Sequence, residues 1–594
     1  MEQKTIPFDL SEERLAQLAD KKFDEGDYLA GLRFTYKIME LYGAGADEFV
    51  ALADAYDDLE LYDLSADSWF RFLDVCEEDE RAEAYEGLYN CFFHLGNGAL
   101  EQYYYGLLRL ERSRMGQTSE DAEYFPDEEE PEEEPSRPRL RLVWPPEKAD
   151  CSPELAAGVA ALRAGEYEKA AAVFGAVPQG APQEGAAQNY LAVAHLLGGK
   201  PEEAERTCRA LLEKNPEDVQ ALCTYAALLT EQGRPQESRA LAERLARIPT
   251  EDPDEMYKAA TVCCENGLYR VGYEYFCKLE KQAGYDLTLL YFKAVAALRC
   301  GETEDCLRTL GTLLDLKPSA AVARYAYREA ERYASEGGEM PEINFFYRIP
   351  AGERVRRMHL LAVFAQMPPA ALAAYCRETD ITELLEWCLD EGNGQEGELQ
   401  LLGLTVAVRA NLQEFWRAAF LSTSVNDAAK LQALCELCEQ NKPFDLGMCI
   451  AGVYRPVAFD RLRTGRTRHM SFVRAYAKCV ARFVPLGFGD AEGYRAAAQK
   501  LYAALEREGV LAAAKDEDSL ACALYLTARG SRGKARDAVK LFGAKAASVA
   551  QFVRIVRGES PAAAEAAAAD ASAEENEREE DGRTRNTEGD DETH

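Results

Sequence analysis

Small residues recur at a fixed interval of 34 positions through the middle of the chain. The small positions are Gly158, Ala192, Ala226, Ala260 and Ala294, and the glycines seven residues after each are Gly165, Gly199, Gly233, Gly267 and Gly301. Apolar or small residues follow nine positions after these glycines, at Phe174, Cys208, Ala242, Phe276 and Leu310. Small residues suit places where two helices touch closely, and a glycine suits the point where the chain reverses. Each unit is therefore predicted to be a helix, a turn and a second helix.

A looser version of the same pattern precedes these five units. Ala19, Ala53 and Gly87 are again 34 residues apart, and Gly26, Glu60 and His94 stand at the turn positions. We expect about three units over 11–110 and five units plus a capping helix over 151–335. A helical hairpin leaves one face apolar, so neighbouring hairpins must stack to bury it, and the prediction is a helical solenoid in two arrays.

These residues resemble the tetratricopeptide repeat family. Its pattern is a 34-residue helical hairpin with small residues at the eighth and twentieth positions and an aromatic residue near the twenty-fourth. The resemblance covers about 16–110 and 151–318. It departs from the family at the fourth position, where Trp is common, and at His94, which replaces the turn glycine. The resemblance implies a superhelix whose concave face, lined by the first helix of each unit, holds a peptide from another protein.

The 34-residue interval is lost after Pro341, although the spacing of apolar residues stays helical. Residues 340–558 are predicted to form an irregular all-helical domain, with one degenerate repeat near 519–545. No run of alternating apolar and polar residues is long enough to predict a strand. The expected fold class is therefore all-α throughout.

Composition and charge predict two segments that lie outside the folded part of the chain. The formal charge is −36, from 68 basic and 104 acidic residues, and 47% of the residues are hydrophobic, which is typical of a globular protein. Residues 111–150 are acidic and Pro-rich and are interpreted as a linker, and the acidic 559–594 as a disordered tail. No apolar run is long enough to span a bilayer and the start does not resemble a signal peptide, so we expect a cytoplasmic protein that binds no membrane.

The sequence offers no convincing catalytic or metal site. Cys435 and Cys438 have the spacing of zinc ligands but share a helical face with Leu431 and Leu434, where buried cysteines pack as small hydrophobes. Phosphate-binding loops, nucleophile elbows and His-Glu-x-x-His motifs are absent. We therefore expect a chain without cofactor or metal that is not an enzyme.

The resemblance also implies which residues would contact a peptide, because the family's ligand face is formed by positions 2, 5, 9, 12 and 13 of each unit. In the first array these positions are acidic and suited to a basic segment, and in the second array they are nearly uncharged and suited to an apolar or amphipathic peptide. The candidate peptide-binding residues are Asp20, Asp54 and Asp57 in the first array and Asn189, Tyr190, Val193, Tyr257, Tyr291 and Val295 in the second. The alternative is that the apolar residues pack against the linker or the C-terminal domain.

Residues 455–482, the arginine-rich segment, carry a local charge of +7 in this acidic chain. Arginine pairs with carboxylates and phosphates through its planar fork of donors. The candidate anion-binding residues are Arg461, Arg463, Arg466 and Arg468. Three interpretations stay open: intramolecular docking of the acidic linker or tail, binding of RNA or a phosphorylated partner, and a solvated surface. The overall negative charge disfavours a general nucleic-acid binder.

Together these features predict a cytoplasmic, non-catalytic scaffold that binds peptide segments of partner proteins on its repeat surfaces. The alternative from another class is a helical enzyme or RNA-binding protein whose active region is 340–558, with the repeats as adaptor.

Overall fold

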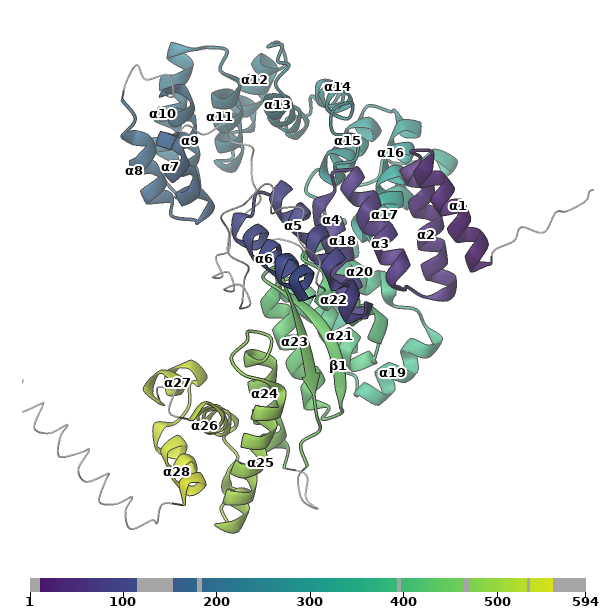
Figure 1. Ribbon diagram of the computed structural model, residues 1–594. Helices are drawn as coiled ribbons and strands as arrows, with labels where there is room; N and C mark the ends of the chain where they lie inside the picture. Colours follow the sequence, from purple (N-terminus) through teal and green to yellow (C-terminus); the bar gives the residue numbers. More distant parts are fainter. Residues whose placement is uncertain are drawn as a thin grey trace, which may run out of the picture. The chain divides into compact units, whose positions relative to one another are not determined.

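The computed structural model describes residues 11–114, 153–178, 184–392, 397–463, 469–530 and 535–558, and these are mainly helical (Figure 1). Residues 115–150 of the predicted linker and the predicted tail, with Arg466 and Arg468, lie outside the described residues, whereas 111–114 are the end of a helix. Three helical hairpins form the first array. Their helices are α1 (Glu12–Asp24), α2 (Tyr28–Tyr42), α3 (Ala46–Asp58), α4 (Tyr62–Val75), α5 (Arg81–His94) and α6 (Gly98–Arg114).

Five further hairpins and one additional helix form the second array. Their helices are α7 (Pro153–Arg163), α8 (Tyr167–Gly175), α9 (Glu184–Leu197), α10 (Pro201–Lys214), α11 (Val219–Glu231), α12 (Pro235–Leu245), α13 (Pro253–Glu265), α14 (Tyr269–Leu279), α15 (Leu287–Arg299), α16 (Thr303–Leu316) and α17 (Ala321–Glu336). The residues of the 34-residue pattern account for this arrangement. Ala192, Ala226 and Ala260 are buried between helices, and the five turn glycines have φ between 69° and 83°. That region favours glycine, which explains why the turn position holds it.

Close contact between the two helices of a hairpin explains the small residues. A Cβ atom added to Gly158 would lie 2.4 Å from Phe174, and one added to Gly272 would lie 2.2 Å from the Cys264 sulfur. The predicted class, a helical solenoid built from tetratricopeptide-like hairpins, is confirmed for the described residues.

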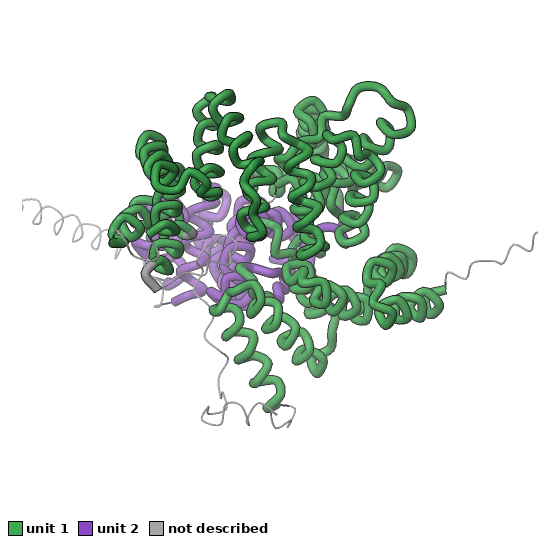
Figure 2. The backbone as a smooth tube through the Cα atoms, turned by 90° about the horizontal axis from the view of Figure 1, so that it is seen from above, with its two compact units in different colours: residues 1–410, 418–426, 451–454 green, residues 411–417, 427–450, 455–594 purple. Residues whose placement is uncertain are grey.

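The chain divides into two compact units (Figure 2). Unit 1 contains residues 1–410, 418–426 and 451–454, and unit 2 contains 411–417, 427–450 and 455–594. These units differ from the five-part division expected from the sequence, which stays a prediction.

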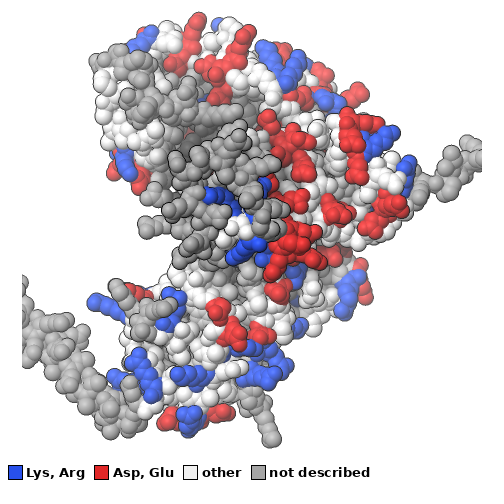
Figure 3. Space-filling view, viewed as in Figure 1, with Lys and Arg blue, Asp and Glu red and all other residues white. Residues whose placement is uncertain are grey.

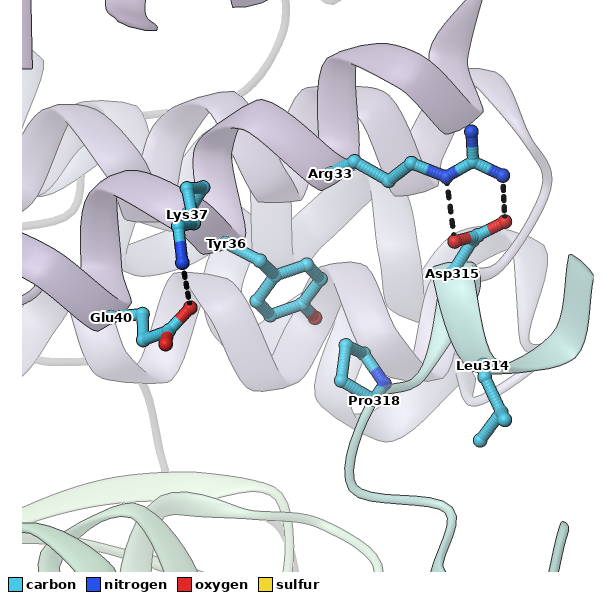
Figure 4. Close-up of a pocket in the computed structure, with 7 residues that line it drawn as sticks. All are labelled: Arg33, Tyr36, Lys37, Glu40, Leu314, Asp315 and Pro318. Carbon is cyan, nitrogen blue, oxygen red and sulfur yellow. Dashed lines mark hydrogen bonds and ion pairs between the residues drawn. The ribbon is translucent and has the colours of Figure 1, made fainter. Parts of the chain in front are cut away.

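Within unit 1, the first array packs against the last hairpin of the second array. Arg33 of α2 donates from Nε to Asp315 of α16 at 2.7 Å, and the Tyr56 hydroxyl donates to the Leu316 carbonyl at 2.7 Å. A small pocket of about 180 Å³ lies at this contact (Figure 4). The charged side chains around it pair with each other, Arg33 with Asp315 and Lys37 with Glu40. The contact is therefore interpreted as a structural seam between the arrays.

The remaining helices follow without the 34-residue interval. They are α18 (Ala351–Gln366), α19 (Pro369–Glu378), α20 (Thr382–Glu391), α21 (Gly397–Ala410), α22 (Gln413–Leu421), α23 (Asp427–Glu439), α24 (Met470–Phe483), α25 (Ala491–Arg507), α26 (Glu517–Arg529), α27 (Ala535–Phe542) and α28 (Ala546–Arg557).

One expectation about this part of the chain is wrong, because two strands occur where none was expected. Strands β1 (Phe444–Ile450) and β2 (Val453–Phe459) form a two-stranded sheet. Only Ala451 and Gly452 connect them, with φ of 53° and 73°, and positive φ at both central residues is typical of the tight hairpin turn whose twist matches the strands. The last five residues of β1 are all buried, so the strand lacks the alternation by which a half-buried strand is recognised.

Candidate peptide-binding face of the second repeat array

The face of α15 that the repeat pattern assigns to ligand binding is covered by the chain itself. Tyr291 and Val295, both candidate peptide-binding residues, are 1% and 2% exposed. One turn further along, Arg299 donates from Nη2 to the backbone carbonyl of Ile343 at 2.8 Å. The covering element is residues 341–349, the connection between α17 and α18, which we call the seated segment.

The seated segment alternates between buried and exposed side chains. Ile343 and Ile349 are each 3% exposed, whereas Phe346 between them is 73% exposed. Phe345 stacks on Tyr269 and also meets Phe292, with ring centroids 6.3 and 6.1 Å apart. This alternation turns one set of side chains toward the repeats and the other toward solvent, although the backbone turns at 345–347 and is not extended throughout.

Tyr347 is the main contact of the seated segment with Tyr291. The two rings meet edge to face at 4.7 Å, a favourable geometry for aromatic pairs. The Tyr347 hydroxyl donates to Asp390 at 3.0 Å, and burial together with this carboxylate raises the pKa of Tyr347 well above its usual value. Tyr347 also has φ of 48°, a backbone conformation that is unfavourable for a side chain of this size.

Two carboxylates at the end of α20 hold the seated segment from its other side. Besides Tyr347, Asp390 accepts the backbone N–H of Val322 in the first turn of α17 at 3.0 Å, where a helix N-terminus favours negative charge. Glu391 accepts the backbone N–H of Ile349 at 3.0 Å and the Trp387 indole N–H at 2.7 Å. Both carboxylates are nearly fully buried, so these partners offset the cost of removing their charges from water.

The other candidate residues of the second array are more accessible. Tyr257 is half-buried on α13, and its ring meets Phe292 of α15 at 6.3 Å. Burial raises the pKa of Tyr257 to about 12, which keeps its hydroxyl protonated at neutral pH. Phe292 also meets Tyr291 at 6.2 Å, so the two candidate tyrosines are linked through this ring.

The candidate residues of α9 lie at the opposite end of the array from the seated segment. Asn189, Tyr190 and Val193 are half-buried. Asn189 donates from Nδ2 to Asp218 at 3.3 Å, while its buried Oδ1 has no hydrogen-bond partner among the described residues. An unsatisfied amide oxygen of this kind is costly and is suited to accept a backbone N–H from a bound peptide.

The candidate residues of the first array form an acidic surface. Asp20 and Asp54 are exposed, and Asp57 accepts the Asn90 amide at 2.8 Å. Partial burial, followed by nearby Glu83 and Asp57, raises the pKa of Asp54. Figure 3 shows many acidic side chains on the face of the molecule that it displays, over the helices of the first array. Basic partners would relieve this repulsion.

In unit 2, acidic side chains of neighbouring helices pair with the helical part of the arginine-rich segment. Arg474 of α24 meets Glu517 at 3.0 Å and Glu439 at 3.6 Å, and Lys478 meets Asp518 at 2.7 Å. Of the four candidate anion-binding residues, the described ones are Arg461 and Arg463, and both are exposed.

The residues of 11–114, 153–178, 184–392, 397–463, 469–530 and 535–558 contain no cluster of three metal-ligating side chains. Cys435 and Cys438 are buried on α23, and burial raises the pKa of Cys435 to about 12, so its thiol stays protonated. No helix in the same ranges is long and apolar enough to cross a membrane.

At Tyr291 the structure agrees with the alternative raised from the sequence, that the apolar face packs against the C-terminal domain, but sequence reasoning did not identify the seated segment or the groups that hold it. Arg299 stands at the thirteenth position of the fifth unit, one of the ligand positions of the repeat, and could have been identified from the same pattern. Ile343, Phe345, Tyr347 and Ile349 occupy every second position, but Phe346 between them is also apolar, so the sequence lacks the clean alternation that would have marked the segment. Little in the local sequence marks Asp390 and Glu391, because their hydrogen-bond partners other than Trp387 lie 37 to 73 residues away along the chain.

The stacked hairpins, with small residues at helix contacts and glycines at the turns, define a helical-repeat protein. Residues 161–224 and 198–254 match two family models described as tetratricopeptide repeat. Together with the 34-residue interval on both sides of these ranges, these matches show that the chain contains tetratricopeptide repeats.

Three solved structures that match parts of the chain are yeast Tom70, YrrB and human IFIT1. The yeast Tom70 structure is 14% identical and the match covers 71% of this chain and 94% of that one, with a TM-score of 0.25. YrrB, described as a TPR protein with an unusual peptide-binding site, is 15% identical over 30% of this chain and 92% of that one, with a TM-score of 0.24. A human IFIT1 dimer with PPP-AAAA is 13% identical, and the match covers 72% of this chain and 94% of that one, with a TM-score of 0.25. No curated protein matches the chain.

Proposed function

We propose that this protein is a non-catalytic cytoplasmic scaffold that binds extended, largely apolar peptide segments of partner proteins on the concave face of its second array. The seated segment is the observation that carries this proposal. It lies on α15 as a peptide ligand would, with the Ile343 carbonyl accepting a hydrogen bond from Arg299 and alternate side chains against the aromatic rings of Tyr291, Tyr269 and Phe292.

The part of the face left for a partner runs from α9 to α13. Tyr257 supplies a rigid aromatic surface that buries much area at low entropic cost. Asn189 supplies a buried amide oxygen that is available to accept a hydrogen bond from a peptide N–H. Because this surface carries few charges, binding should depend little on salt concentration.

The first array supports a second, separate contact with basic segments. Asp20, Asp54 and Asp57 are the residues expected to meet them. This contact should weaken as salt screens the charges, unlike the apolar contact of the second array.

The experiment selects 12-residue peptides from a random library on the immobilised full-length chain and measures their affinity by fluorescence polarisation. We expect the selected peptides to carry apolar residues at alternate positions. Tyr257→Ala and Asn189→Ala should each cost about 1–3 kcal/mol of binding free energy, if these residues act as anchors.

The matched control is Leu541→Ala, an exposed apolar residue on α27 in unit 2, which should leave the affinity unchanged. Circular dichroism confirms that each variant keeps its helical content. If the selected peptides bind Tyr257→Ala and Asn189→Ala as tightly as the original chain, the concave face is not the binding surface.

A further inference from the structure

The seated segment is held by two different sets of contacts along its length. Its first half, residues 341–345, contacts the repeats through a hydrogen bond from Arg299 and through Phe345, which packs on the core of the second array. Its second half, residues 347–349, is held by the two buried carboxylates at the end of α20, which accept hydrogen bonds from it. The two halves therefore have separate anchors.

A joint of two glycines precedes the first half. Gly337 and Gly338 have φ of 71° and 108°, which glycine adopts at little cost. A Cβ atom added to either glycine would meet no other atom within 4 Å, and residues 337–340 are all exposed. Hinges are formed by a few loop residues of this kind, whose backbone angles absorb a movement. The first half can therefore turn about this joint while α17 stays in place.

A tight turn separates the first half from the second. The Asn344 side-chain oxygen accepts the backbone N–H of Phe346 at 2.8 Å, and Tyr347 has φ of 48°. Phe345 and Phe346 are neighbours in this turn with opposite surroundings, because Phe345 packs on the second array whereas Phe346 is 73% exposed. The two phenylalanines therefore offer a matched pair for experiment.

Phe345 covers an aromatic surface of the second array, which we call the aromatic subsite and which consists of Tyr269 and Phe292. The Phe345 ring stacks on Tyr269 at 6.3 Å with 14° between the ring planes, and it meets Phe292 at 6.1 Å and 64°. Phe292 in turn meets Tyr257 at 6.3 Å. The aromatic subsite is therefore continuous with the part of the face that runs from α9 to α13.

We infer that residues 341–345 are a built-in competitor of the partner peptide, and that the aromatic subsite takes an aromatic side chain of that peptide once Phe345 has moved away. This inference rests on the proposed function and specifies the ligand of the same face. A backbone carbonyl two residues before the partner's aromatic residue accepts the hydrogen bond from Arg299, as the Ile343 carbonyl does in the closed arrangement.

The competitor sets the affinity of the face for its ligand. A site that is open for part of the time binds its ligand more weakly, in proportion to the open fraction. Removing the contacts of the first half should therefore tighten peptide binding, although the side chains of the face itself are unchanged. A segment that only formed a fixed wall for the peptide would give the opposite result, because its ring would then be one of the peptide's contacts.

The test compares Phe345→Ala with Phe346→Ala in the full-length chain. Random 12-residue peptides are selected on the immobilised Phe345→Ala chain and titrated with each chain by fluorescence polarisation. We expect the selected peptides to carry an aromatic residue and to bind Phe345→Ala roughly fivefold more tightly than the original chain. Phe346→Ala, the matched control, should change their affinity less than twofold. Circular dichroism checks helical content, and Phe345→Leu replaces Phe345→Ala if that chain is not folded.

Two further measurements separate a competitor from a fixed wall. Replacing the aromatic residue of the peptide by alanine, or adding Arg299→Ala to Phe345→Ala, should abolish the gain in affinity. In the original chain, amide hydrogen exchange of residues 342–345 should become faster when the peptide is bound, while that of 347–349 stays slow. Unchanged or slower exchange of 342–345, or unchanged or weaker binding to Phe345→Ala, would overturn the inference.

The proposed function and this inference fail in different ways. If Tyr257→Ala weakens binding of the peptides whereas Phe345→Ala leaves it unchanged, the α9–α13 face binds peptides and the seated segment does not compete with them. If Phe345→Ala tightens binding whereas Tyr257→Ala and Asn189→Ala leave it unchanged, the aromatic subsite binds peptides and the α9–α13 face does not.

Discussion

Tyr257 and Tyr291 occupy the same position in adjacent repeats, yet their surroundings give them different roles. Tyr291 is 1% exposed and packs on Tyr347, whereas Tyr257 is half-buried. Tyr291→Ala should therefore leave a cavity and cost about 3–5 kcal/mol of stability, as for other buried aromatic residues. Tyr257→Ala should cost clearly less. Calorimetry on the full-length variants measures the shift of the unfolding transition.

Tyr291→Phe is the matched control, because it keeps the ring that contacts Tyr347. Its transition should stay close to that of the original chain. Equal shifts for Tyr257→Ala and Tyr291→Ala would mean that the seated segment does not protect Tyr291.

A single carboxylate on α18 should make stability depend on pH. Hydrogen bonds from Arg356, with a smaller part from Arg357, lower the pKa of Glu353 from 4.5 to about 2. A carboxylate whose pKa is lowered by folding stabilises the protein above its unfolded pKa, and this contribution is lost as the pH falls toward 2. Glu353→Gln should therefore cost about 1–3 kcal/mol at pH 7, and the difference from the original chain should shrink between pH 4.5 and 3. A difference that is constant over this range would contradict the assignment.

At the scale of the elements, the close contact within each hairpin is the feature to test. Ala204 of α10 is fully buried at the twentieth position of its unit. Ala204→Leu should overpack the contact with α9 and cost about 1–3 kcal/mol. Ala240→Leu on α12 is the control, because Ala240 is exposed and the change there should be close to neutral. Thermal unfolding that is the same for both variants would show that the assigned register is wrong.

At the scale of the whole molecule, the uneven charge is the feature to test. If the acidic linker and tail dock on the arginine-rich segment, removing 570–594 and neutralising 127–134 should free Arg461 and Arg463. Retention on heparin should then increase, most clearly at low salt where screening is weak. Arg461→Gln/Arg463→Gln in the same background should abolish the increase. Unchanged retention on heparin would indicate that the arginine-rich segment is a solvated surface.

The sequence by itself determined the repeating hairpin. The glycine at each turn and the small residue at each helix contact act locally, within one unit of 34 residues, and the same local requirement is repeated along the chain. The described helices of both arrays follow from it. The hairpin of β1 and β2 was not predicted, because its first strand is buried on both faces and its turn is Ala-Gly rather than one of the common pairs.

Only the tertiary structure decided what covers each face of the repeats. The position of Tyr291 in the repeat predicts an exposed anchor. In the structure Tyr291 is buried, because Tyr347, 56 residues later, packs on it and is held by Asp390. Helix α18 likewise has apolar residues on both faces in the sequence, and only the structure shows that Leu361 and Phe364 are buried whereas Val355 and Val363 are exposed. Periodicity identifies which residues share a face of a helix, but the partner of that face comes from distant segments whose placement depends on the packing of the whole unit.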